Sequence, residues 1–505
     1  MTRRPDFRGH RSLAICCVSA LLLCCGPAPR KADLIVGVEA EPASLDPRRG
    51  SDVAADRAFR LLYRSLFTTG RNFEPVPDLV ERWERRGPAT YAFSLKRGVI
   101  FSDGRELTSA DAVFTLDSIR TGAVPSFRKG DLDRIASVAA TGRYEFAVTL
   151  REPYAPFLAN LNVGILPDGT SADAEAPIGC GPYKLREWTP GQWLVFEANA
   201  FAAEKPICRS VAFKVIPDPV VRALEMRRGS VDLVVNDLPP DSLAYFRREG
   251  YPVVREPGAN YAYLGLNCAR PPLDRKEIRQ ALAYAVDREA ILKCILDGFG
   301  RKATGLLCPE NWAWNEDTPD YPHDPARAAA LLDAAGLKRG PGGARFKMVY
   351  KTSNSKVSRQ IATAIAQQLA EVGVEVSIQW LEWGTFYGDV RRGDFDCFAL
   401  TWVGVTDPDG LRLRFSSKAF PPDGFNRGRY SNPEVDRLVE EGAREQDPAR
   451  RREIYIKVQA ILAEEVPYVS LWFPDNVAVA QKGVGNLLLP PDGNFSFIAG
   501  VGRRE

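Results

Sequence analysis

The segment TWVGVTDPDG, residues 401–410, places two carboxylates directly after an apolar run. Asp407 and Asp409 flank Pro408, and Gly410 follows, so we predict a turn at the end of a buried strand. Acids at such a position can serve catalysis, hold a metal ion or bind a charged ligand. The fourth alternative is structural, in which both acids only cap backbone amides of the turn.

Histidine is too scarce for most hydrolytic sites, because the chain has only His10 and His323. A Ser-His-Asp triad would have to use His323, which lies in the loop sequence DYPHDPARA before a predicted surface helix. Neither G-x-S-x-G nor G-x-x-x-x-G-K-[ST] occurs. A secreted hydrolase with a pair of carboxylates stays open as an alternative, since no motif excludes it.

The N-terminus has the pattern of an export signal, with four arginines and one acid followed by the short apolar stretch SLAICCVSALLLCCG. Residues 22–25, Leu-Leu-Cys-Cys, resemble a bacterial lipobox. We therefore predict removal of residues 1–24, lipidation of Cys25 and a tether at 25–31. The alternative is an ordinary cleaved signal with incidental cysteines. No later apolar run has the length of a spanning helix, so we expect the lipid to be the only membrane anchor.

The composition is that of a globular protein, with 505 residues of which 45% are hydrophobic and 26% charged, enough for two or three domains. Removing residues 1–24 lowers Lys+Arg from 67 to 63 and Asp+Glu from 64 to 63. The remaining chain is formally neutral, which argues against nucleic acid as a partner.

Strands alternate with helices in both halves of the chain. Helical spacing is clear in residues 54–68 and 357–373, and TSADAVFTLDSI (108–119) is predicted as a helix capped by Thr108 or Ser109. Residues 274–296 are predicted as one long helix with an apolar stripe. Such alternation predicts two α/β domains.

Five segments in order resemble the peptide- and nickel-type family of bacterial ABC-transporter solute-binding proteins, the family 5 (oligopeptide- and dipeptide-binding) type. The resemblance covers about 34–480. The segments are YAFSLKRGVIFSDGRELTSADAVFTLDSI, GCGPYKLREWTPGQ, NCARPPLDRKEIRQALAYAVDREAI, DPARAAALLDAAG and RYSNPEVDRLVEEGAREQDPARRREIY.

This resemblance implies an α/β, two-lobed periplasmic-binding-protein fold of the Venus-flytrap type (class II, cluster C), with an extra domain inserted in the first lobe. The expected ranges are 32–62, 176–260 and 475–505 for lobe I, 63–175 for the inserted domain, and 261–474 for lobe II. Because the chain crosses between the lobes more than once, closure is expected to be a hinge motion.

The resemblance also implies a function without chemistry on the solute. The expected protein is a monomeric receptor in the periplasm or cell envelope that binds an oligopeptide or dipeptide and delivers it to ABC permease subunits with cytoplasmic ATPases. No cofactor and no bound metal are implied. Glutathione, an opine, a sugar or a metal chelate are alternative solutes, although a single histidine offers little to a metal.

By the same resemblance, TWVGVTDPDG lies in the cleft wall of lobe II, and its candidate ligand contacts are Trp402, Gly404, Asp407 and Asp409. Peptide-binding members of the family hold the ligand's amino terminus with an aspartate shortly after the tryptophan. Alignment on the tryptophan places Val405 at that position. Either Asp407 takes over through a shortened loop, or the ligand has no free amino terminus, or the acids only form the turn.

Further candidates are weaker. Glu41 and Ser44 match the lobe I loop that faces the cleft, with a solvated loop as the alternative. Tyr263 lies on the strand that opens lobe II, where core packing is the alternative. Asn426, with its neighbour Arg427, could add polar contacts, and one of Trp380 and Trp383 could face the cleft rather than the core.

Six cysteines follow Cys25, and an even number in an exported protein suggests disulfides. The assigned lobes suggest three pairs, while free buried cysteines are the alternative. The pairs are Cys268 with Cys397, Cys180 with Cys208, and Cys294 with Cys308.

Overall fold

The computed structural model describes residues 31–172, 176–422 and 424–503. The predicted leader (1–24) and the lipidation site Cys25 lie outside the described residues. Within the described ranges, the strands form one seven-stranded, one six-stranded and one four-stranded sheet, together with two small pairs. In the same ranges, no helix has both the length and the apolar character needed to cross a bilayer.

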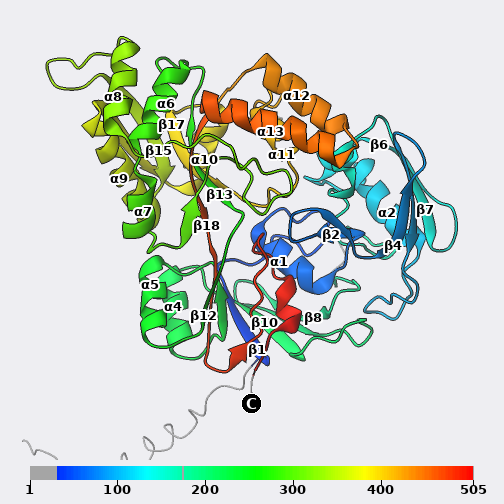
Figure 1. The fold of residues 1–505 in the computed structure, drawn as a ribbon. Coiled ribbons are helices and arrows are strands. Elements are labelled where there is room, and N and C mark those ends of the chain that lie inside the picture. The colour runs from blue at the N-terminus through cyan, green and yellow to red at the C-terminus, as the bar shows by residue number, and fades with distance from the viewer. Residues whose placement is uncertain (1–30, 173–175, 423, 504–505) are drawn as a thin grey trace, which may run out of the picture.

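The seven-stranded sheet and its helices, which we call lobe I, lie at the bottom of Figure 1. Its central strand β1 (Leu34–Val38) is buried along its whole length, because parallel neighbours pair with it on both sides and helices cover the sheet. The sheet order is β12 (Val253–Glu256), β19 (Asn476–Ala480), β11 (Leu233–Val235), β1, β10 (Ser210–Val215), β9 (Trp193–Ala198) and β8 (Tyr183–Thr189). The other elements are α1 (Val53–Leu62), α4 (Pro219–Arg227), α5 (Pro240–Arg248), β20 (Val484–Gly485), β21 (Gly502–Arg503) and the 3-10 helix Ser496–Gly500.

The six-stranded sheet and its helices, which we call lobe II, lie above lobe I in Figure 1. Along β13 (Tyr261–Leu266), alternate side chains enter two different core clusters, so both faces of this sheet are covered. The sheet order is β14 (Gly300–Lys302), β18 (Tyr468–Pro474), β13, β17 (Cys397–Trp402), β15 (Phe346–Ser353) and β16 (Val374–Leu381). The helices are α6 (Lys276–Ala285), α7 (Arg288–Cys294), α8 (Pro325–Ala334), α9 (Lys356–Glu371), α10 (Trp383–Arg392), α11 (Gly410–Phe415), α12 (Pro433–Arg444) and α13 (Pro448–Glu465).

The four-stranded sheet has its own core and stands at the right of Figure 1. Its helix α2 (Ser109–Arg120) begins with a capping box, in which the Thr108 amide donates to Asp111 at 2.7 Å. The predicted helix with a cap at Thr108 is therefore confirmed. We call this part the inserted domain. Its elements are β2 (Phe67–Thr69), β3 (Pro75–Pro77), β4 (Val80–Arg85), β5 (Thr90–Leu95), α2, α3 (Lys129–Leu132), β6 (Ile135–Ala140), β7 (Glu145–Leu150) and the 3-10 helix Ala155–Leu158.

The single long helix predicted over 274–296 is wrong, because the structure divides it into α6 and α7. Val286 leaves the helix in an extended conformation, and Asp287 starts the next one by accepting from the Ala290 amide at 2.9 Å. An N-cap aspartate within an apolar periodic pattern was the signal for this break.

None of the three predicted disulfides forms, since all six cysteines are free. Cys268 and Cys397 pack against core clusters on opposite faces of the lobe II sheet. Cys180 lies in the core of the inserted domain, whereas Cys208 lies in the core of lobe I. Cys294 is exposed on α7, and Cys308 is buried in a lobe II core. The first two pairs are thus divided between different core clusters, and the third joins an exposed cysteine to a buried one.

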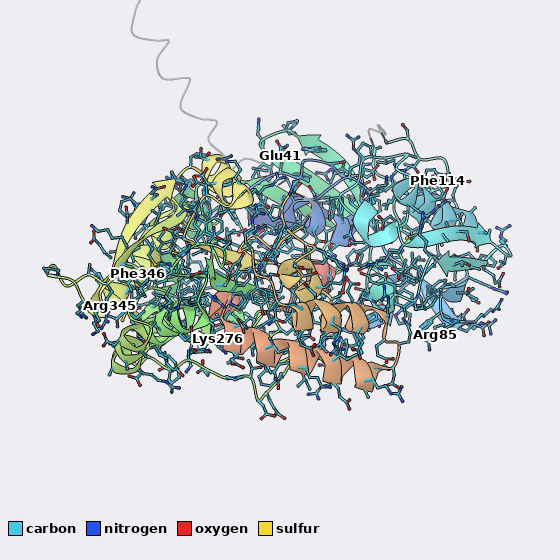
Figure 2. The ribbon with its side chains drawn as sticks, turned by 90° about the horizontal axis from the view of Figure 1, so that it is seen from above. Glu41, Arg85, Phe114, Lys276, Arg345 and Phe346 are labelled. Carbon is cyan, nitrogen blue, oxygen red and sulfur yellow. The ribbon has the colours of Figure 1, made fainter. Side chains whose placement is uncertain are left out.

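Lobe II is held by contacts to both other parts. The Lys356 ammonium pairs with Asp241 of lobe I at 2.7 Å. The Arg444 guanidinium contacts Glu152 of the inserted domain at 3.2 Å, and Arg85 donates to Gln446 at 2.7 Å. Figure 2 shows Arg85 near the orange helices α12 and α13. One of these contacts joins lobe II to lobe I, and the other two join it to the inserted domain.

The two chain crossings between the lobes touch each other. One crossing joins β12 to β13 and the other joins β18 to β19. A Cβ atom at Gly258 would collide with the carbonyl oxygen of Pro474, so the first crossing needs glycine in order to lie against the second. The spacing of the two crossings is thus set by backbone contact.

We expect Gly258→Ala to destabilise the protein by about 1–3 kcal/mol, because the added methyl forces the two crossings apart. Gly87→Ala is the matched control, since a Cβ atom there meets nothing within 4 Å. Equilibrium unfolding in urea measures both. Equal stabilities of the two variants would contradict close contact between the crossings.

Candidate ligand-binding site

The two large sheets turn the carboxyl ends of parallel strands toward each other. In lobe I, β1 and β11 are parallel, and Asp241 lies in the helix that follows β11. In lobe II, β15 and β17 are parallel, and Lys356 begins the helix that follows β15. The Lys356–Asp241 pair joins these two points, so both carboxyl edges meet between the lobes. Ligands of open α/β sheets bind at such edges.

At the lobe II edge, strand β17 ends in Trp402, whose ring belongs to a stack of aromatic side chains. The Tyr263 ring lies parallel to it, with 5.9 Å between ring centroids. The ring of Tyr468 stacks on that of Tyr263, with 4.1 Å between their centroids. Tyr263 is fully buried, as the core-packing alternative expects. The stack gives the edge a rigid apolar floor.

Two guanidinium groups lie on the Trp402 ring. The central carbon of Arg414 is 4.2 Å from the ring centroid and that of Arg427 is 4.4 Å away. Arg427 donates to the hydroxyls of Tyr263 at 3.4 Å and Tyr387 at 3.0 Å, and Arg414 donates to the Gly410 carbonyl at 3.0 Å. Burial lowers the pKa of Arg414 to about 10, and the like charge of Arg427 contributes to that shift.

Asp407 and Asp409 already have cationic partners. The Arg451 guanidinium donates to both oxygens of Asp407, at 2.6 and 3.0 Å. Arg412 does the same for Asp409 at 2.7 and 2.8 Å, and the Tyr154 hydroxyl of the inserted domain donates to Asp409 at 3.1 Å. Asp409 is 3% exposed. The geometry therefore favours the structural alternative for both acids, and contact with a ligand stays a prediction.

Two lobe I candidates also serve the fold. Glu41 accepts from the Trp188 indole at 3.0 Å and from the Gly191 amide at 2.9 Å, which ties the loop after β1 to the β8–β9 hairpin. Figure 2 shows Glu41 at the margin of the molecule beside this hairpin. Ser44 accepts from the Asp46 amide at 3.1 Å, a local turn contact.

The remaining candidates differ in role. Asn426 is 1% exposed and bonds to Ser416 and Tyr430, so it fixes the backbone beside Arg427 rather than offering its amide. Gly404 is exposed at a φ of +70°, as its turn requires. Trp380 and Trp383 are both exposed, so the core alternative is wrong for them.

Sequence reasoning missed a charged cluster at the lobe I edge. Glu39 follows β1 and Asp237 follows β11, and the Arg57 guanidinium of α1 bonds to both, at 3.0 Å for Asp237. Burial, with help from the neighbouring carboxylate of Glu39, raises the pKa of Asp237 to about 7. The available signal was an acid directly after an apolar run, the same pattern that singled out Asp407.

His323 does not form a catalytic triad. Its Nδ1 atom lies 3.5 Å from Asp287 at the start of α7. Within the ranges that the structure describes, no serine or threonine hydroxyl is hydrogen-bonded to this imidazole. The geometry therefore gives the triad hypothesis no nucleophile.

We expect Asp407→Asn to destabilise the protein by about 3–5 kcal/mol, because it leaves the Arg451 guanidinium buried without a full counter-charge. Glu434→Gln is the control, since its pair with Arg437 is exposed on α12. Thermal and urea unfolding compare the two. An Asp407→Asn variant as stable as the control would refute the structural role of this acid.

We expect Asp237→Asn to gain stability relative to the unchanged protein as pH rises from 5 to 8. The folded-state pKa of about 7 lies above the ordinary value of 3.8, so the stability from the protonated carboxyl is complete below 3.8 and is lost as pH rises through 7. The asparagine variant has no proton to lose. Melting temperatures at both pH values test this, and a constant difference between the two proteins would contradict it.

Known proteins share both the sequence pattern and the fold. Residues 74–420 match the family model of bacterial extracellular solute-binding proteins, family 5 (middle). The chain is 27% identical over 500 residues to the dipeptide-binding protein of Escherichia coli (strain K12), covering 92% of this chain and 93% of the relative.

Two solved structures extend the comparison. The oligopeptide-binding protein AppA of Bacillus subtilis, in complex with a nonapeptide, has a TM-score of 0.78 and 28% identity over 94% of this chain and 99% of that one. NikZ of Campylobacter jejuni, in complex with Ni(L-His), has a TM-score of 0.81 and 25% identity over 94% and 100%. The predicted two-lobed α/β fold of cluster C is confirmed. This chain belongs to the family 5 bacterial extracellular solute-binding proteins.

Proposed function

We propose that the chain is the solute receptor of an ABC importer and binds a peptide or peptide-like solute between its lobes. The observation that carries this proposal is the arginine pair at the lobe II edge, which no described acid balances, together with the carboxyl groups at the lobe I edge. Glu39 and Asp237 lie at the lobe I edge, and Arg414 and Arg427 lie at the lobe II edge. A short peptide, with an ammonium at one end and a carboxylate at the other, matches this pattern.

The relatives support the same class of solute. One is a dipeptide-binding protein, and a solved structure with the same fold holds a nonapeptide. NikZ holds a nickel–histidine complex, so a compact chelate that carries carboxylate groups is the second candidate. The arginines at the lobe II edge, which have no ion pair, fit this second candidate as well, because they would donate hydrogen bonds to a carboxylate of the chelate.

In this proposal the protein changes shape and leaves the solute unchanged. The paired crossings at Gly258 and Pro474 let lobe II swing as one body, and the solute favours closure by contacting both edges at once. The closed receptor then docks on membrane permease subunits, and ATP is hydrolysed by other chains. A lipid on Cys25 would keep the monomeric receptor at the cell envelope.

Native mass spectrometry of the purified full-length protein tests the receptor function. We expect the protein to carry discrete bound masses that are lost on denaturation, and we expect the released molecules to be short peptides. Such ligands should stay bound through purification because charged groups on two closing lobes slow the release of a zwitterion. A single mass with a metal isotope pattern would replace peptide with chelate.

A protein without adducts is then screened by thermal shift against tripeptides, glutathione, sugars and metal chelates. Peptides that raise the melting temperature would support the proposal. No shift with any compound would refute the receptor function.

A further inference from the structure

Arg414 and Arg427 differ from the other buried arginines in how their charge is balanced. Among the described residues, six further arginines are similarly buried: Arg48, Arg57, Arg222, Arg279, Arg288 and Arg451. Five of them form an ion pair with a carboxylate. Arg222 lacks one but donates four hydrogen bonds to backbone carbonyls.

Neither guanidinium on Trp402 has such compensation. In the described part of the chain, Arg414 and Arg427 have no carboxylate within ion-pair distance, and they are only 9% and 6% exposed. Arg414 donates one hydrogen bond, and its Nε is buried without a partner. A buried charge without a counter-ion is costly, and two of the same sign on one ring add repulsion.

Around this ring, two donors and the hydroxyl of Tyr468, which can donate or accept, are left without partners. The Nε of Arg414 and the indole Nε1 of Trp402 are both buried and unpaired, and neither can accept a hydrogen bond. Arg427 uses two of its donors on the Tyr263 and Tyr387 hydroxyls, which hold the guanidinium in one orientation. A site that offers donors and positive charge is completed by an anionic acceptor.

Exposed apolar side chains adjoin this cluster at the same edge. Phe425 meets the Trp402 ring edge-on at 5.9 Å, and Trp383 stacks on Tyr387 at 5.8 Å. Phe425, Trp383 and Val403 are 44%, 55% and 51% exposed. Large apolar side chains exposed together mark a surface that another molecule covers.

We propose that Arg414 and Arg427, stacked on Trp402, bind a carboxylate of the solute at the lobe II edge. This rests on the proposed receptor function, and because the proposed solutes are peptide-like, the anionic group is a carboxylate rather than a phosphate. The solute's carboxylate end therefore enters lobe II, and its body lies along Trp383, Val403 and Phe425. Asp407 and Asp409 stay in their own ion pairs.

The test uses the full-length protein and an equimolar mixture of Ala-Xaa-Ala tripeptides, prepared as free acids and as C-terminal amides. Native mass spectrometry measures the apparent dissociation constants. We expect the amides to bind at least about tenfold more weakly, because a charge-assisted bond to a buried guanidinium is lost. Equal affinity of acids and amides would overturn the proposal while leaving peptide binding intact.

Arg427→Gln and Arg414→Gln should each weaken binding of the free acids by about tenfold or more and leave the amides unchanged. Arg359→Gln is the matched control, since Arg359 is exposed on α9 and lies over Trp380 at the same edge. It removes the same charge and should keep full affinity. Unaltered acid binding in Arg427→Gln, with its melting temperature preserved, would overturn the proposal.

If neither form of tripeptide binds, the receptor function for peptides fails, and the arginine pair is judged by thermal shift with benzoate, benzamide and inorganic phosphate. A rise in melting temperature with benzoate alone, absent in Arg427→Gln, would support a carboxylate site for a non-peptide solute. A rise with phosphate alone, or with none of the three, would overturn the carboxylate site.

Discussion

The ion pair between Asp407 and Arg451 fixes the segment on which the lobe II edge depends. Both carboxylate oxygens accept from one guanidinium, so the turn after β17 is held from the side by α13. Trp402 precedes this turn and Arg414 follows it in α11. The pair thereby sets the distance between an aromatic ring and the cation that lies on it, although it contacts neither.

The two edges differ in how their charged side chains are paired. At the lobe I edge, Glu39 and Asp237 share the guanidinium of Arg57. The pKa of Asp237 is raised to about 7, so this carboxyl is protonated at lower pH. At the lobe II edge, two arginines share no acid among the described residues. The lobe I cluster is neutral while Asp237 holds its proton and gains one negative charge when the proton is lost, whereas the arginines of the lobe II edge would be balanced by a carboxylate of the solute.

Local signals in the sequence were enough for most of the fold. Thr108 caps α2, and Asp324 caps α8 with Gly336 in the left-handed conformation after its end, because these signals act over a few residues. One such signal, Asp287, was missed inside an apolar pattern. The family resemblance then placed the elements in two lobes, which the solved relatives confirm.

The site could be predicted only in part, because its chemistry depends on distant partners. Asp407 looks free in its own segment, but Arg451 lies 44 residues later, and Asp409 meets a tyrosine 255 residues earlier. Arg427 was noticed beside Asn426, yet its importance comes from having no acidic neighbour, which only a folded structure reveals. Two of the cysteine pairs failed for the same reason, since their members lie in different core clusters.

The bond from Tyr154 to Asp409 links the inserted domain to the segment that carries the Trp402 ring and α11. The inserted domain is therefore in contact with lobe II as well as being part of the chain of lobe I. If the inserted domain moves with lobe I, opening of the lobes breaks this hydroxyl–carboxylate contact, whether or not a solute is present. The inserted domain would then slow the release of the solute, so that the dissociation rate of the closed complex depends in part on residues that do not contact the solute.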